Sequence, residues 1–95
     1  MASFSERERR EVRYHGQVQG VGFRFSARRI ASTFDVTGFV RNLPDGSVHV
    51  VVEGVRDEID RCLGTIAQSM DEYIDRADVA DAMATGEFTV FDVRF

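Results

Sequence analysis

The order of hydrophobic periods along the chain is the feature that most constrains its fold. Two segments with helical spacing of apolar residues, 24–34 and 55–70, are separated and flanked by segments in which apolar and polar residues alternate. The alternating segments are residues 11–18, 36–42, 47–53 and 77–83. A period of two indicates a strand, and a period near 3.6 indicates a helix. The chain therefore predicts the order βαββαβ, an α+β sandwich in which two helices cover one face of an antiparallel sheet.

The two ends of the chain differ from this pattern. Residues 1–10 are charged and have no hydrophobic period, which predicts a flexible N-terminal tail. Residues 88–95 predict a short extra strand with Phe91, Val93 and Phe95 on one face. Because a chain of 95 residues has room for one modest core, we expect a single domain over residues 11–95.

This topology brings two polar segments to one edge of the sheet. The crossover through the first helix makes the first two strands parallel, so their carboxyl ends lie at the same edge. The first strand leads into a glycine-rich turn and Arg24, and the second ends on Asn42. With the third strand between them, the two ends are roughly 10 Å apart. An arginine side chain and a bound anion can fill that gap.

The glycine-rich turn predicts an anion site. Residues 19–23 (QGVGF) directly precede the first helix, where backbone N–H groups have no helical partner. Glycines let such groups converge into a concave nest, and the helix dipole adds partial positive charge. Glycine is also common in turns for steric reasons alone. The dinucleotide fingerprint is not matched, because Phe25 and Ser26 occupy the place of its third glycine.

Arg24 and Asn42 each have two interpretations. A cation in the first turn of a helix either costs a few tenths of a kcal/mol or faces a bound anion. Asparagine at a strand end is ordinary turn chemistry when taken alone. Its place at the same edge as Arg24 favours the alternative, a neutral amide that orients a water molecule.

Composition excludes several classes of protein. All 12 basic residues are arginine, and the absence of lysine excludes Walker-type phosphate loops and Schiff-base chemistry. The first fifty residues carry 8 Arg and 5 acids, or +3, and the remainder carries 4 Arg and 11 acids, or −7, in agreement with the total of −4. An acidic whole argues against general nucleic-acid binding but allows one local anion site in the basic half.

Other features bound the compartment and the cofactors. No apolar run is long enough to span a membrane, and residues 1–11 lack the apolar segment of a signal peptide. We therefore expect a cytoplasmic protein with no membrane partner. The single cysteine, Cys62, falls on an apolar helical stripe and predicts a core residue. His15 and His49 are too far apart in sequence to form a zinc site with it, so we expect no metal.

Three segments carry a family resemblance: residues 16–24 (GQVQGVGFR), 38–46 (GFVRNLPDG) and 48–54 (VHVVVEG). At this spacing they resemble the acylphosphatase family, in register over residues 11–54 and more loosely to residue 95. The resemblance implies a ferredoxin-like sandwich and an acylphosphate phosphohydrolase. Such an enzyme hydrolyses carboxyl–phosphate anhydrides without metal or cofactor.

The resemblance also implies a role for each site residue. Arg24 and Asn42 would be the catalytic residues, the guanidinium binding the phosphoryl group and the amide holding the attacking water in line. The backbone amides that would hold the phosphoryl oxygens are those of Gln19, Gly20, Val21, Gly22, Phe23 and Arg24. Neither the glycine-rich segment 16–24 nor the segment 38–46 that contains Asn42 has an obvious general base. The resemblance implies that the substrate's own carboxyl oxygen would accept the proton.

The chain departs from the family pattern at three places. Leu43 follows Asn42 where family members can carry a hydroxyl, which bears on the support of the Asn42 side chain. Phe39 replaces a tryptophan, a change within aromatic packing. Residues 70–79 (MDEYIDRADV) replace a proline-containing segment, so we expect a different surface loop there and unaffected catalysis.

Two other functions remain possible at this point. An RNA-recognition module would display stacking aromatics on its central strands, and residues 48–52 have none. A non-catalytic, anion-binding ferredoxin-like accessory domain, as in hydrogenase-maturation proteins, would belong to a longer chain. The presence of both Arg24 and Asn42 favours turnover. We expect a small-molecule acyl phosphate as substrate, inorganic phosphate as product and inhibitor, no nucleic-acid partner and a monomer.

Overall fold

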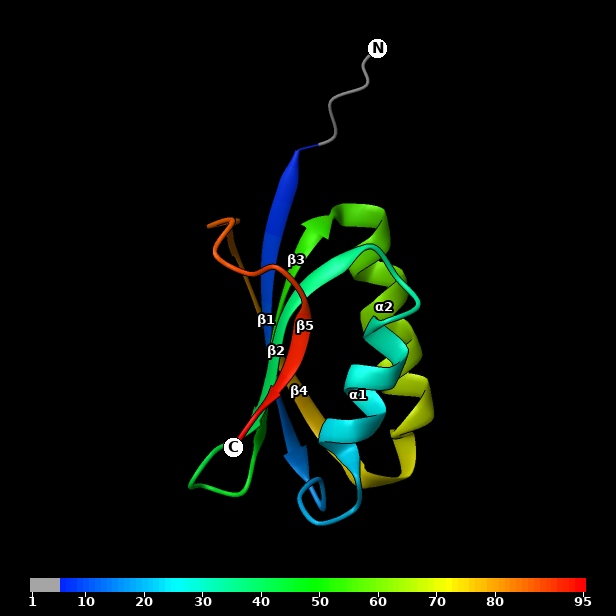
Figure 1. Ribbon diagram of the computed structural model, residues 1–95. Coiled ribbons are helices and arrows are strands. Elements are labelled where there is room, and N and C mark those ends of the chain that lie inside the picture. The colour runs from blue at the N-terminus through cyan, green and yellow to red at the C-terminus, as the bar shows by residue number, and fades with distance from the viewer. Residues whose placement is uncertain (1–5) are drawn as a thin grey trace.

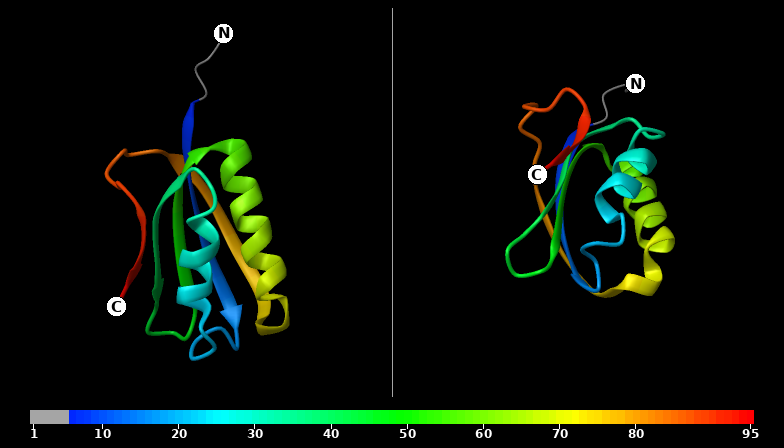
Figure 2. Two further views of the ribbon diagram at one scale, coloured as in Figure 1. Left: turned by 45° about the vertical axis from the view of Figure 1, so that its right-hand side comes forward. Right: turned by 60° about the horizontal axis from the view of Figure 1, so that its bottom comes forward.

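The computed structural model, which describes residues 6–95, forms one five-stranded sheet with both helices packed on the same face (Figures 1 and 2). The elements in chain order are β1 (Arg7–Gly16), α1 (Phe23–Ala31), β2 (Val36–Asn42), β3 (Val48–Val55), α2 (Arg56–Ser69), a 3-10 turn η1 (Asp71–Tyr73), β4 (Ile74–Met83) and β5 (Phe91–Arg94). The predicted α+β sandwich is confirmed. The two helices and first four strands follow the predicted order, but β4 begins at Ile74, within the segment 70–79 where we expected a surface loop, because residues from Ile74 onward pair with β1.

The strands lie in the order β4–β1–β3–β2–β5. β3 is antiparallel to both β1 and β2, so β1 and β2 run in the same direction and end at the same edge, as predicted. β5 is parallel to β2, which makes the sheet mixed rather than purely antiparallel. The reason is topological: after β4 the chain crosses to the opposite edge of the sheet and there runs alongside β2 (Figure 1).

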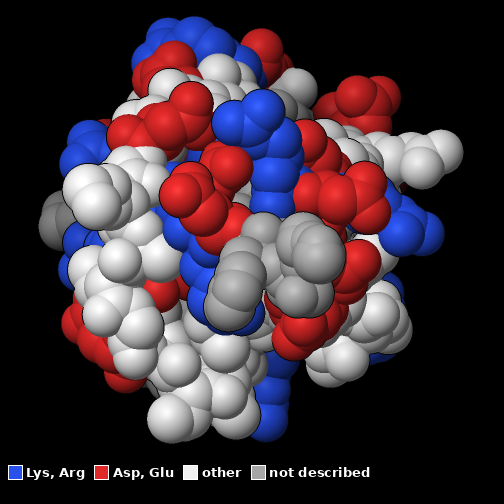
Figure 3. Space-filling view, turned by 90° about the horizontal axis from the view of Figure 1, so that it is seen from above, with Lys and Arg blue, Asp and Glu red and all other residues white. Residues whose placement is uncertain are grey.

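The prediction of an N-terminal tail over residues 1–10 is wrong for residues 7–10, which belong to β1. These residues lack an apolar period, but distant acids bind their side chains. Arg9 Nη1 lies 3.2 Å from a Glu53 carboxylate oxygen, and Arg10 pairs with Asp60 and Asp81. Acidic and basic side chains lie next to one another at this end of the molecule (Figure 3). Residues 1–5 lie outside the described part of the chain.

The core lies between the helices and the sheet. Its fully buried side chains include Val50 and Val52 of β3, Phe23 of α1 and Ile59 of α2. Cys62 is also buried there, and burial raises the pKa of its thiol to about 11, so it is a core residue as predicted. In the described residues neither helix is long and apolar enough to cross a membrane.

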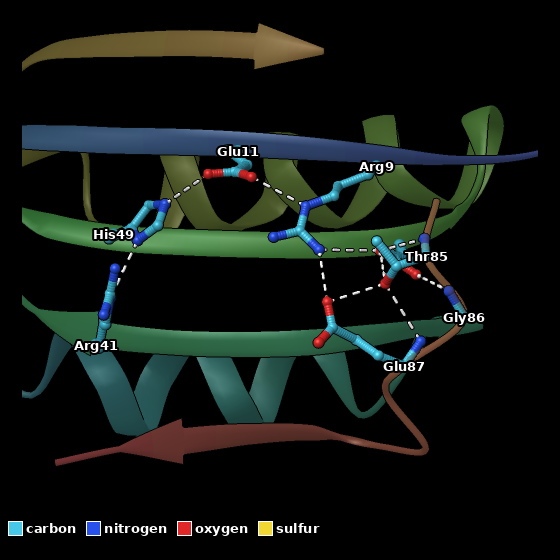
Figure 4. Close-up of polar contacts among 8 residues, drawn as sticks. Arg9, Glu11, Arg41, His49, Thr85, Gly86 and Glu87 are labelled. Atoms are coloured by element: carbon cyan, nitrogen blue, oxygen red, sulfur yellow. Dashed lines mark hydrogen bonds and ion pairs between the residues drawn. The ribbon is translucent and has the colours of Figure 1, made fainter. Parts of the chain in front are cut away.

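The opposite face of the sheet carries a polar network (Figure 4). His49 Nε2 lies 3.0 Å from a Glu11 carboxylate oxygen, and Arg41 Nε donates to His49 Nδ1 at 3.2 Å. Arg9 continues the network toward the segment between β4 and β5, which lies against this face. The C-terminal strand is shorter than predicted. Phe91 is buried, whereas Phe95 lies beyond the strand and is exposed.

Candidate active site

Gly16 ends β1 at a point of close backbone approach. A Cβ atom there would lie 2.4 Å from the Tyr73 carbonyl oxygen and 2.8 Å from the Asp75 nitrogen, at a φ of +133°. No real Cβ is accommodated at such distances, so a side chain would push β1 away from the start of β4. This contact fixes where the loop before α1 leaves the sheet.

The loop from residue 17 to residue 22 turns the chain into α1 through two glycines in the left-handed conformation. Gly20 has a φ of +79° and Gly22, the N-cap residue of α1, a φ of +80°. Non-glycine residues rarely adopt this conformation, because Cβ then crowds the carbonyl oxygen. No side chain of residues 6–95 caps the start of α1, and its first turn contains no acid. The helix therefore begins with its positive end uncompensated.

The backbone N–H groups of this loop have no acceptor on the described chain. Ser26 N–H donates to Gly22 O at 3.0 Å, but no hydrogen bond among residues 6–95 engages the N–H groups of residues 19–24. Unpartnered N–H groups at a helix start form a ready anion site. The loop presents six such groups, those of Gln19, Gly20, Val21, Gly22, Phe23 and Arg24.

A pocket of about 170 Å³ lies at this edge of the sheet. It brings together Arg24, which projects from the first turn of α1, and Asn42, the last residue of β2. The full set of lining residues is Val18, Gly20, Gly22, Phe23, Arg24, Phe25 and Asn42. Gln19 and Val21, whose amides were predicted to bind phosphate, do not line it. The loop before α1 and the end of β2 lie at the same end of the molecule (Figure 2, right).

A larger groove of about 430 Å³ lies along α1 and β5 and contains none of the predicted site residues. Its lining is mostly apolar, and its two charged residues, Arg28 and Asp92, approach each other to 4.0 Å. Volume therefore does not mark the candidate site. The candidate site is distinguished instead by backbone N–H groups and an arginine, Arg24, that have no carboxylate partner among residues 6–95.

Arg24 is available to an external anion. It forms no ion pair with a carboxylate of residues 6–95, whereas Arg9 and Arg10 each pair with three acids. Its Nη1 donates to Arg94 O at 3.4 Å, and its guanidinium carbon lies 4.7 Å from the centre of the Phe95 ring. These contacts orient the side chain and leave its charge uncompensated.

The Gln19 side chain links the loop to the Asn42 turn, a contact that the sequence did not indicate. Its Nε2 donates to the carbonyl oxygens of Leu43 and Ser47, both at 2.8 Å. Leu43 N–H also donates to Ser47 O at 2.9 Å, which closes the turn. Leu43 therefore contributes to the support of Asn42 through its backbone, although it lacks a hydroxyl. A carboxamide within a glycine loop is the sequence signal that could have suggested such a link.

Asp45 stabilises the same turn from within. Its Oδ1 accepts hydrogen bonds from Ser47 N–H at 2.9 Å and from Ser47 Oγ at 2.5 Å. The Ser47 hydroxyl and N–H lower the pKa of the Asp45 carboxyl. Asp45 is therefore occupied by the turn and does not line the pocket.

Neither histidine lines the pocket. His15 contacts Asp78 on β4 at 3.1 Å. His49 is buried in the network on the opposite face, and burial lowers its pKa although Glu11 opposes the shift. The Arg41 bond to Nδ1 requires a lone pair there, which places the proton on Nε2. Within residues 6–95, no group of three or more His, Cys, Asp or Glu residues is arranged to hold a metal ion.

Comparison with known proteins shows that the chain is similar to acylphosphatases over most of its length. A family model described as Acylphosphatase matches residues 10–93. The acylphosphatase of Methylococcus capsulatus is 44% identical over 79 residues, which cover 82% of this chain and 86% of that protein. The structure of an acylphosphatase from Coxiella burnetii is similar, with a TM-score of 0.81 and 27% identity. The match covers 98% of this chain and 100% of that chain. The crystal structure of HypF from T. kodakarensis is similar with a TM-score of 0.79 and 28% identity, but the match covers 93% of this chain and only 12% of HypF.

Proposed function

Because the chain belongs to the acylphosphatase family, we propose that it hydrolyses the carboxyl–phosphate bond of acyl phosphates to a carboxylate and inorganic phosphate. The observation that carries the proposal is the pocket in which Arg24, Asn42 and the start of α1 meet. A cation, a set of free N–H donors and a neutral amide suit a reaction that needs positioning and charge neutralisation.

In this mechanism the loop before α1 and Arg24 bind the phosphoryl group. The backbone N–H groups of residues 19–24, of which Gly20, Gly22, Phe23 and Arg24 line the pocket, and the helix dipole stabilise the charge on its equatorial oxygens. The Arg24 guanidinium donates two parallel hydrogen bonds to the same group. The guanidinium lies against the Phe95 ring and its Nη1 donates to Arg94 O, so the N–H groups of Nε and Nη2 are available for this contact.

Asn42 holds the attacking water on the side of the phosphorus opposite the leaving carboxylate. The amide oxygen can accept a hydrogen bond from one O–H of the water and so orient the lone pair of the water along the line of attack. The Gln19 link sets the distance between Asn42 and the loop, so the water and the phosphoryl group meet in one geometry.

The reaction needs no protein base in this arrangement. The residues that line the pocket contain no carboxylate and no imidazole. The leaving group is a carboxylate, which is stable as an anion, and its oxygen can accept the proton from the attacking water. We propose that the enzyme acts as a monomer, in the cytoplasm and without metal or cofactor.

The competing function is an anion-binding accessory domain that does not catalyse hydrolysis. The similarity to part of HypF favours this alternative. Hydrolysis of benzoyl phosphate by the purified protein in excess EDTA separates the two. We expect turnover that EDTA leaves unchanged, with inorganic phosphate as a competitive inhibitor. A folded protein that binds phosphate but does not hydrolyse benzoyl phosphate would contradict the enzyme and support the accessory domain.

A further inference from the structure

Two exposed phenylalanines lie together beside the candidate active site. Phe25 lines the pocket with 60% of its surface exposed, and Phe95 is 92% exposed. Their ring centres are 6.5 Å apart, with an angle of 54° between the ring planes. Among the large apolar residues exposed in the described chain, these two are the only aromatic ones.

The core does not explain this pair. Neither ring belongs to the buried cluster between the helices and the sheet. Phe25 comes from the first turn of α1 and Phe95 follows β5, so the fold brings together two distant parts of the sequence. Exposed apolar surface that adjoins a polar site is typical of ligand binding.

The pocket leaves the acyl part of a substrate at its mouth. Its volume of about 170 Å³ is smaller than the roughly 300 Å³ at which pockets for larger ligands begin. A phosphoryl group bound by the loop and Arg24 and the water held by Asn42 share that space. The acyl group must therefore project past the rim, where Phe25 forms part of the lining.

Arg24 connects the two rings to the phosphoryl group. Its guanidinium lies 4.7 Å from the centre of the Phe95 ring, and Phe25 follows it directly in the helix. A substrate whose phosphoryl group binds at the edge of this guanidinium has its acyl group within reach of both rings.

We propose that Phe25 and Phe95 form an aromatic ledge that binds the acyl group and selects acyl phosphates with flat, apolar acyl groups. This inference rests on the proposed function. A planar ring on the ledge buries apolar surface of the substrate and of both phenylalanines. A two-carbon acyl group is too small to contact both rings and gains little from them.

The test compares kcat/KM for benzoyl phosphate with kcat/KM for acetyl phosphate in each variant. The intrinsic reactivity of the two substrates cancels, because the ratio is compared between proteins. We expect the ratio to fall about threefold in Phe25→Ser and in Phe95→Ser and about tenfold in the double variant. Phe95→Tyr keeps a ring at this position and is expected to retain the wild-type ratio. The matched control is Val79→Ser on β4, which removes a 60% exposed apolar side chain outside the pocket and is expected to leave both activities unchanged.

The outcomes distinguish the ledge from its rivals. An unchanged ratio in a folded double variant overturns the ledge. Equal losses on both substrates also overturn it, because they mean that the rings only position Arg24. A wild-type protein that hydrolyses neither substrate overturns the proposed function and with it the inference. Circular dichroism and thermal unfolding establish that each variant is folded.

Discussion

The loop before α1 and the loop after β4 both present backbone N–H groups, but within residues 6–95 a carboxylate binds only those of the second loop. Thr85 and Gly86 donate their N–H groups to the Glu53 carboxylate at 2.9 and 3.0 Å, and the Thr85 hydroxyl donates at 3.0 Å. Arg9 completes the shell around this fully buried carboxylate. The N–H groups of residues 19–24 have no such acceptor among the described residues.

The difference shows what makes such a loop a binding site. Burial raises the pKa of Glu53, but the hydrogen bonds from Thr85, Gly86 and Arg9 outweigh it, so the pKa lies below its ordinary value. The Thr85 and Gly86 N–H groups of the loop after β4 are thus used in a contact that stabilises the fold. The first loop leaves the same kind of donors open, which supports the proposal that it binds an anion from outside the chain.

The two helices repeat this contrast. The first turn of α2 contains Asp57 and Glu58, and a Glu58 carboxylate oxygen accepts a hydrogen bond from Asp35 N–H at 2.8 Å. The first turn of α1 contains Arg24 and no acid. Acids stabilise a helix start, so the dipole of α2 is compensated by its own first turn and that of α1 is not, in agreement with the proposed anion site.

The largest expected effect comes from Arg24→Lys. Lysine keeps the charge but loses the planar fork and the contact of the guanidinium with the Phe95 ring, so we expect kcat/KM for benzoyl phosphate to fall about a thousandfold. The control is Arg28→Lys, one helical turn further along α1 and outside the pocket, with an expected change below twofold. Near-wild-type activity in Arg24→Lys would show that the first loop needs no arginine.

The next effect separates binding from attack. In Asn42→Ala we expect kcat to fall about a hundredfold while the inhibition constant for inorganic phosphate changes less than threefold. The loop and Arg24 still bind phosphate in this variant, and only the water loses its partner. Equal losses in turnover and in phosphate binding would contradict the water-positioning role.

Glu53→Gln tests how much the contact between Glu53 and the loop after β4 stabilises the fold. The amide keeps the shape but loses the charge that Thr85, Gly86 and Arg9 surround, so we expect the free energy of unfolding to fall by about 2 kcal/mol at pH 7. Activity should stay within twofold of wild type, because Glu53 lies outside the pocket. The control is Glu87→Gln on the same loop, where an exposed carboxylate should contribute less than about 1 kcal/mol.

The pH dependence of the Glu53 contact has a defined sign. Since the folded pKa lies below the ordinary value of 4.5, ionised Glu53 stabilises the fold above that pH. The contribution is lost as the pH falls through the lowered pKa. In urea titrations, the difference between wild type and Glu53→Gln should therefore shrink below about pH 4. A difference that grows on acidification would show that the contact does not depend on the ionised carboxylate.

The smallest effect concerns the link between the loop and the turn. Gln19→Ala removes two hydrogen bonds but keeps the backbone N–H, so we expect about 1 kcal/mol less stability and a kcat about fivefold lower. Phosphate inhibition should be nearly unchanged, since the donors remain. Gln17→Ala, on the exposed part of the same loop, is the matched control. An unaltered kcat in Gln19→Ala would mean that the turn positions Asn42 without this link.

Most of the fold was predictable because its signals are local. The alternation in residues 36–42 and the apolar helical stripe that contains Cys62 can each be recognised within a short stretch of sequence. The rule that crossover connections are right-handed and join parallel strands then makes β1 and β2 parallel. The first strand was predicted to begin too late, because Arg7–Arg10 have no hydrophobic period. Their place in β1 depends on pairing with β3 and on acids such as Glu53, Asp60 and Asp81, which are distant in sequence.

The sequence by itself determined the order of the elements, the glycine loop before α1 and the edge at which Arg24 and Asn42 meet. These follow from hydrophobic period, backbone conformation and the handedness of the crossover. Only the tertiary structure decided that Gln19 bonds to the turn after Asn42, that Glu53 accepts the N–H groups of the loop after β4 and that the Phe95 ring contacts the Arg24 guanidinium. Each of these contacts joins side chains and backbone more than twenty residues apart. Their geometry depends on strand pairing and packing, which no local pattern encodes.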